Sequence, residues 1–267
     1  VGIVIGSGVF FKAEKVLNAT GGNLPLGILA WGIGGLIMMI CAYTFSLLAS
    51  KYEKVNGIVD YADEALGNKY GYYVGWFMTM IYYPSLTSVL AWVSARYTCV
   101  LAGVDVEGGE AMALAGFYLV LSYGVNALSP IIAGKFQVTT TVIKLIPLLL
   151  MAVIGTAVGL KSGMLIENFT TVVEEVSTSS ALFTAVVATA FAYEGWIVAT
   201  SINSELKDSK KNLPKALVLG SLIVVSVYIL YYIGLAGGIS NEVMMSGGET
   251  AAKMAFERIF SSAGGTI

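Results

Sequence analysis

Two apolar stretches of the chain are interrupted by residues that do not suit a membrane-spanning helix. The first interruption is Gly6-Ser7-Gly8, within VGIVIGSGVFF, and the second is Glu194-Gly195, within ATAFAYEGWIVATS. Hydrocarbon offers no partners to backbone N–H and C=O groups, so a span unwinds only where it lines a cavity or is covered by protein. Interruptions at corresponding positions of two halves of a chain point to a transporter's substrate site.

The glycine-rich interruption supplies backbone groups that suit the two ends of an amino acid. Glycine leaves helical dihedral angles at little cost and lets a ligand approach closely. A helix that restarts at Val9 presents free N–H groups and the positive end of its dipole, which together bind a carboxylate. The segment that ends near Val4 presents free carbonyls to an ammonium group. The alternative interpretation is that these small residues only allow close helix packing.

The second interruption adds side chains to the same chemistry. The run Phe191-Ala192-Tyr193-Glu194-Gly195-Trp196 offers carbonyls, aromatic rings that could close over a ligand, and one carboxylate. Core packing is the alternative interpretation of the rings. A carboxylate inside a span is costly and usually faces a cavity or a partner, so packing alone does not explain Glu194.

Lys144 lies deep within another apolar stretch, VIKLIPLLL. One interpretation is a lysine that extends its ammonium group toward a nearby helix end. We favour a buried cation, because Pro147 and the apolar run after it place Lys144 well inside the span. A buried ammonium group could stand where another transporter binds Na⁺, or it could exchange a proton.

Seven apolar stretches must position these residues. The 267 residues are 57% hydrophobic and 12% charged, whereas a soluble domain carries about 25% charged residues. Each stretch can cross about 30 Å as a helix of about 20 residues. The predicted spans are 1–17, 25–50, 70–102, 111–129, 134–160, 179–203 and 214–237. We also expect an interfacial helix at 57–67 and an extramembrane helix at 241–262.

The organisation of the chain follows from these spans. No low-complexity linker divides residues 1–267, so we expect a single transmembrane domain. The distance of five spans between the interruptions indicates a five-helix repeat that begins again at span six. We therefore expect further helices beyond the seventh span, and a native amino end ahead of Val1.

Composition and charge exclude several other function classes. The chain has no histidine, and no nucleophile–base pair can be proposed, so we expect neither an enzyme nor a metal or other cofactor. The net charge of −2 offers no basic surface for nucleic acid. Loops after spans two, four and six hold eight Lys residues against five Lys and Arg residues on the opposite side. This bias predicts a cytoplasmic amino end.

Two motifs resemble those of the amino acid–polyamine–organocation (APC) superfamily. The segment IVIGSGVFF resembles its first-helix motif, and residues 204–208 with 211–216 (SELKD and KNLPKA) resemble its signature after helix six. FAYEGW together with Lys144 is similar to the L-amino acid transporter (LAT) branch, and to bacterial alanine–serine–cysteine exchangers of the BasC type. The resemblance covers the whole chain. It implies an all-α membrane protein of twelve helices with the five-plus-five inverted-repeat (LeuT-like) fold, of which helices one to seven and the following extracellular loop are present.

The resemblance also implies roles for individual residues. Backbone N–H groups of Ser7 and Gly8 would bind the substrate carboxylate. Carbonyls of Val4, Phe191 and Glu194 would bind the amino group. Phe191 would act as a gate, Lys144 would occupy the place of a sodium site, and Tyr228 would contact Lys144 or the substrate path. The substrate-binding residues predicted in this way are Val4, Ile5, Gly6, Ser7, Gly8, Phe191, Ala192 and Glu194.

The implied function is sodium-independent exchange of small neutral L-amino acids, such as Ala, Ser and Cys, across the plasma membrane by alternating access. A proton-coupled symporter, or an arginine or glutamate antiporter, are the alternatives on the same fold. Two departures from the pattern matter. The loop 102–109 lacks the Cys of heavy-chain-linked members, so no disulfide-linked heavy chain is expected. Those members also tend to have Gly where this chain has Glu194.

Overall fold

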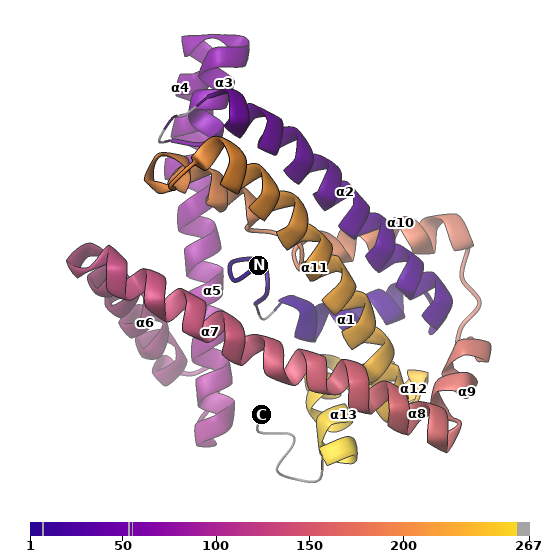
Figure 1. The fold of residues 1–267 in the computed structure, drawn as a ribbon. Coiled ribbons are helices and arrows are strands. Elements are labelled where there is room, and N and C mark those ends of the chain that lie inside the picture. The colour runs from indigo at the N-terminus through magenta and orange to yellow at the C-terminus, as the bar shows by residue number, and fades with distance from the viewer. Residues whose placement is uncertain (7, 53, 55, 261–267) are drawn as a thin grey trace. The chain divides into compact units, whose positions relative to one another are not determined.

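The computed structural model describes residues 1–6, 8–52, 54 and 56–260, and this part of the chain is helical without β-strands, as predicted (Figure 1). The α-helices are α1 (Gly8–Ala19), α2 (Leu24–Lys51), α3 (Ile58–Leu66), α4 (Asn68–Phe77), α5 (Tyr83–Ala102), α6 (Gly109–Leu128), α7 (Pro130–Leu150), α8 (Thr156–Ser162), α9 (Met164–Thr170), α10 (Thr178–Ala190), α11 (Ser209–Gly238), α12 (Asn241–Ser246) and α13 (Ala251–Phe260). Two π-helical turns continue helices within long spans, η1 (Met78–Tyr82) and η2 (Met151–Gly155). Two 3₁₀ segments complete the set, η3 (Trp196–Glu205) and η4 (Gly248–Thr250).

Four of the described helical segments are long and apolar enough to cross a membrane by length and composition. They are Leu24–Lys51, Gly109–Leu128, Ile131–Ser162 and Ser209–Gly238, which correspond to predicted spans two, four, five and seven. Spans one and six do not reach this length as single helices, because their interruptions leave α1 with 12 residues and α10 with 13. Span three consists of α4, η1 and α5 in succession.

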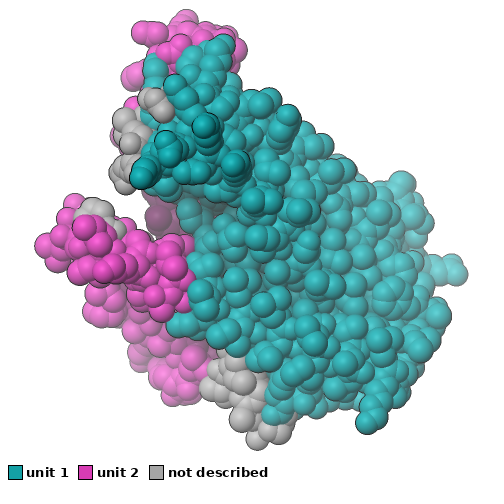
Figure 2. Space-filling view, viewed as in Figure 1, with its two compact units in different colours: residues 1–55, 141–267 teal, residues 56–140 magenta. Residues whose placement is uncertain are grey.

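The chain forms two compact units, residues 1–55 with 141–267 and residues 56–140 (Figure 2). The first unit contains both interruptions, Lys144 and Tyr228. The single transmembrane domain expected over 1–267 stays a prediction.

The first unit is built on α2 and α11, which run side by side (Figure 1). Helix α2 begins where the Asn23 side chain accepts a hydrogen bond of 3.0 Å from the Leu26 N–H, so one unpaired donor of the first turn is satisfied. Its small residues face the core and let bulky side chains of α11 approach. The largest of these, Tyr228, Tyr231 and Tyr232, are buried.

The second unit contains α3, α4, α5 and α6. Helices α5 and α6 pack through small residues, with Ala91 and Ala95 against Ala115. The hydroxyl groups of Thr98 and Tyr118 are 2.7 Å apart across the same pair of helices. The amphipathic helix predicted at 57–67 is present as α3, of which Tyr61 is the buried residue.

The predicted helix at 241–262 is divided in the structure. Helix α12 ends at Ser246, a turn follows in which Gly248 has φ of +52°, and α13 then begins at Ala251. The positive φ of Gly248 explains the division, because an α-helix cannot continue through a left-handed residue. Helix α12 packs against α1, and α13 packs against α11. They bury Met244 and Phe256, respectively, in the core of the first unit.

Candidate functional site

The first interruption coincides with the start of a helix. Helix α1 begins at Gly8, and the preceding residues 1–6 form turns in which the Ile5 N–H donates to the Val1 carbonyl at 2.9 Å. Ile5 is fully buried. Gly6 borders open space, since the nearest atom to a β-carbon built there is the Val4 carbonyl oxygen at 4.0 Å. Ser7 lies outside the described residues.

The second interruption begins earlier than the sequence predicted. Helix α10 ends at Ala190, and residues 191–195 form successive turns before the chain continues as the 3₁₀ segment η3. The last of these residues, Gly195, has φ of +101°. The unwound stretch therefore starts at Phe191, and Glu194-Gly195 marks its end.

The structure brings the two interruptions into contact. A β-carbon built on Gly8 would lie 3.0 Å from the Ala192 Cα and 3.4 Å from Cδ1 of Phe191. A β-carbon on Gly195 would lie 2.8 Å from Cγ2 of Ile3. The free N–H groups at the start of α1 and the turn 191–195 are thus neighbours, although about 185 residues separate them in the sequence.

The hydroxyl group of Tyr228 connects the two interruptions. It lies 2.9 Å from the Val4 carbonyl oxygen and 3.1 Å from the Ala192 carbonyl oxygen, and Tyr228 is fully buried. A phenol has one proton to donate, so the two carbonyls share it. Because each carbonyl oxygen has two lone pairs, Val4 can still accept from an ammonium group. The sequence placed Tyr228 near Lys144 or the substrate path, and the structure shows it between the interruptions.

The turn 191–195 is also attached to α2. The Tyr193 hydroxyl donates to the Trp31 carbonyl at 2.9 Å, and the rings of these residues meet edge to face at 5.7 Å between centroids. Trp31 also meets Tyr228 at 5.7 Å. The sequence analysis missed Trp31. Its signal was a large aromatic residue within a run of small residues on α2, which marks a place where another helix comes close.

Two charged side chains lie at this turn. The Glu194 carboxylate is half-buried and accepts a hydrogen bond of 2.9 Å from the Gly195 N–H. The ammonium group of Lys12, on α1, lies 5.2 Å from the centroid of the Phe191 ring. The sequence analysis did not single out Lys12, although it lies four residues after Gly8 and therefore on the same helix face.

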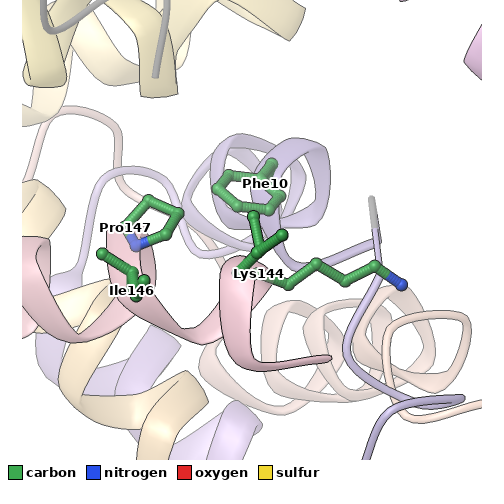
Figure 3. A pocket seen from close by; sticks show the side chains of 5 residues that line it. Phe10, Lys144, Ile146 and Pro147 are labelled. Carbon is green, nitrogen blue, oxygen red and sulfur yellow. The ribbon is translucent and has the colours of Figure 1, made fainter. Parts of the chain in front are cut away.

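Lys144 lines an open cavity of about 370 Å³ beside α1 (Figure 3), in which Ile143 and Ile146 are more than half exposed. The other lining residues are Phe10, Ile143, Ile146 and Pro147, so the walls are apolar apart from Lys144. Phe10 lies two residues after Gly8, which places the cavity next to the first interruption. Lys144 is only half-buried there, whereas the sequence predicted a buried cation. Within the part of the chain that the structure describes, the Lys144 ammonium has no hydrogen-bonded or ion-paired partner.

Comparison with known proteins gives concordant matches. A model of the amino acid permease family matches residues 1–267. The serine/threonine exchanger SteT of Bacillus subtilis is 31% identical over 268 residues, which cover 100% of this chain and 59% of that protein. The b(0,+)-type amino acid transporter 1 of Mus musculus is 29% identical over 233 residues, which cover 86% of this chain and 47% of that protein. The large neutral amino acids transporter small subunit 2 of Homo sapiens is 26% identical over 265 residues, which cover 94% of this chain and 48% of that protein. The chain thus spans about half of the length of these relatives.

Proposed function

The chain belongs to the amino acid permease family, and from that premise we propose that it forms the substrate-binding part of a secondary transporter. The proposed activity is sodium-independent exchange of small neutral L-amino acids across the plasma membrane by alternating access. The protein is a multi-pass membrane protein, and we propose from the distribution of Lys and Arg that its amino end is cytoplasmic.

The contact between the two interruptions is the observation that carries this proposal. The N–H groups of the first turn of α1 have no acceptor inside that helix, and they lie next to a turn with irregular backbone carbonyls. Neighbouring backbone groups could therefore serve both ends of a zwitterion. We propose that Ser7 and Gly8 bind the carboxylate, and that the carbonyls of Val4, Phe191 and Glu194 bind the amino group. Ile5, Gly6 and Ala192 complete the site.

Lys144 supports independence from sodium. We propose that its ammonium group replaces a bound cation, because it lies in an otherwise apolar cavity next to the first turn of α1. Tyr228 fixes the relative position of the two interruptions through its hydrogen bonds.

The names of the relatives support exchange and amino acids as substrates. One relative is a serine/threonine exchanger and another a b(0,+)-type amino acid transporter. We further propose that the protein acts without a disulfide-linked heavy chain, since the loop 102–109 carries no cysteine.

A proton-coupled symporter is the second candidate, because Glu194 in the second interruption and Lys144 beside the first are ionisable groups that could carry a proton. An arginine or glutamate antiporter ranks below it, because the combination of FAYEGW with Lys144 resembles the LAT branch.

Uptake of labelled L-alanine into proteoliposomes of the whole protein tests these candidates. An exchanger takes up label only when unlabelled amino acid is inside, and its rate ignores Na⁺ and pH gradients. Uptake into empty vesicles that follows a proton gradient would instead establish the symporter.

Lys144→Ala, with Lys161→Ala as the control, then identifies the role of the Lys144 ammonium group. Lys161 is an exposed lysine in α8, directly after the end of the same predicted span. We expect Lys144→Ala to reduce exchange strongly while leaving it insensitive to pH. A parent whose exchange depends on pH, with a dependence that Lys144→Ala abolishes, would support proton coupling.

A further inference from the structure

We infer that Lys12 determines substrate specificity by forming, with the Phe191 ring, a positively charged cover over the α1 side of the site. This cover favours neutral amino acids over those with cationic side chains. The inference rests on the proposed function and names a residue that selects the substrate class.

The geometry places Lys12 at the site rather than in a loop. Residues four apart lie on the same face of a helix, about one turn or 6 Å along its axis. The Gly8 face of α1 meets Ala192 and Phe191, so the Lys12 side chain emerges one turn further along the same face. Its ammonium group lies 5.2 Å from the Phe191 centroid, within the range of about 6 Å for a cation–π interaction.

The surrounding charges make this position selective. Lys144 lines the cavity on the Phe10 side of α1, and Lys12 lies on the Phe191 side. The Glu194 carboxylate, at the far end of the turn, is bonded to the Gly195 N–H. A substrate carboxylate at the start of α1 is attracted by both ammonium groups, whereas a cationic substrate side chain near Phe191 is repelled by Lys12 at short range.

The cation–π pair links this charge to the proposed gate. A neutral side chain can lie under the Phe191 ring while Lys12 stays above it. A cationic side chain either meets the ammonium group or separates it from the ring, and in both cases closure over the substrate becomes less favourable.

Competition in proteoliposomes of the whole protein tests the inference. Exchange of labelled L-alanine is measured with increasing unlabelled L-alanine or L-arginine outside, for the parent and three variants. Lys12→Gln removes the charge, Lys12→Arg keeps the charge and the ring contact, and Lys15→Gln removes an exposed charge on the same helix. Lys12→Met replaces Lys12→Gln if the latter does not fold.

We expect Lys12→Gln to reduce the preference for alanine over arginine by about five- to tenfold, as loss of one nearby like charge predicts. Lys12→Arg and Lys15→Gln should keep the preference of the parent. An unchanged preference in Lys12→Gln, an equal loss in Lys15→Gln, or a parent that takes arginine as readily as alanine would each overturn the inference. A parent that exchanges no amino acid would refute the proposed function itself, and this inference with it.

Discussion

The two interruptions of the first unit both unwind an apolar stretch, but they are built from different residues. The first consists of small residues and leaves open space beside Gly6. The second carries bulky side chains, with buried Ala192 and Tyr193 and one glycine at positive φ. Glycines expose backbone N–H groups to a ligand, whereas the aromatic turn can cover that ligand. We therefore propose that the first interruption binds the substrate carboxylate, and that the second both binds the amino group and closes the site.

Gly8→Val should have the largest effect, because it fills the place where the interruptions meet. Its β-branched side chain would start 3.0 Å from the Ala192 Cα and would disfavour the backbone of the interruption. We expect binding of L-alanine to weaken about a hundredfold or more, because the added side chain would displace the groups that bind the substrate. The control is Gly32→Val on α2, where a β-carbon meets no atom within 4 Å. Undiminished alanine affinity in Gly8→Val would refute the carboxylate site.

Gly195→Ala tests whether the glycine at positive φ in the second interruption is needed for transport as well as for stability. A side chain at φ of +101° costs roughly 1–2 kcal/mol, and the new β-carbon would also displace Ile3. Gly67→Ala is the control, because Gly67 has φ of +91° and no neighbour within 4 Å. We expect both variants to lower the Tm, and Gly195→Ala alone to reduce exchange by about tenfold or more. Equal exchange rates in the two variants would mean that backbone strain is the whole effect.

Phe191→Ala separates closing from binding. Without the ring, the site should close poorly, so we expect exchange to fall about tenfold while alanine affinity falls less than about threefold. Phe183→Ala provides the control, since Phe183 lies on the same helix span and its residue is 72% exposed. Losses of the same size in exchange and affinity would indicate that Phe191 is a contact and not a gate.

Tyr228→Phe should have the smallest effect, because it removes one shared hydrogen bond and keeps the ring. The loss of the bonds to the Val4 and Ala192 carbonyls should cost about 1 kcal/mol, or about fivefold in alanine affinity. Tyr232→Phe is the matched control, because that buried hydroxyl has no hydrogen-bond partner among the described residues. It should leave affinity unchanged. Equal effects of the two variants would argue against a connecting role for Tyr228.

The positions of the interruptions could be predicted from the sequence because their signals are local. Glycines and a carboxylate within an apolar run are unfavourable for a spanning helix wherever the run packs. The extent of the second interruption could not be predicted in this way. It begins at Phe191, where the Ala192 backbone meets Gly8 and the Tyr193 hydroxyl reaches the Trp31 carbonyl. Those contacts belong to other helices, so the sequence of the turn does not contain them.

The sequence by itself determined that this is a helical membrane protein with two broken spans and one cation deep in a third. The effects of hydrophobicity, glycine and charge on a spanning helix extend over about one helical turn. They can therefore be recognised from the sequence of a single segment. The tertiary structure alone decided that the Tyr228 hydroxyl reaches a carbonyl 224 residues away, and that Lys12 lies over Phe191. Hydrogen bonds and cation–π contacts depend on distances of a few ångströms between segments, and those distances exist only once the helices have packed.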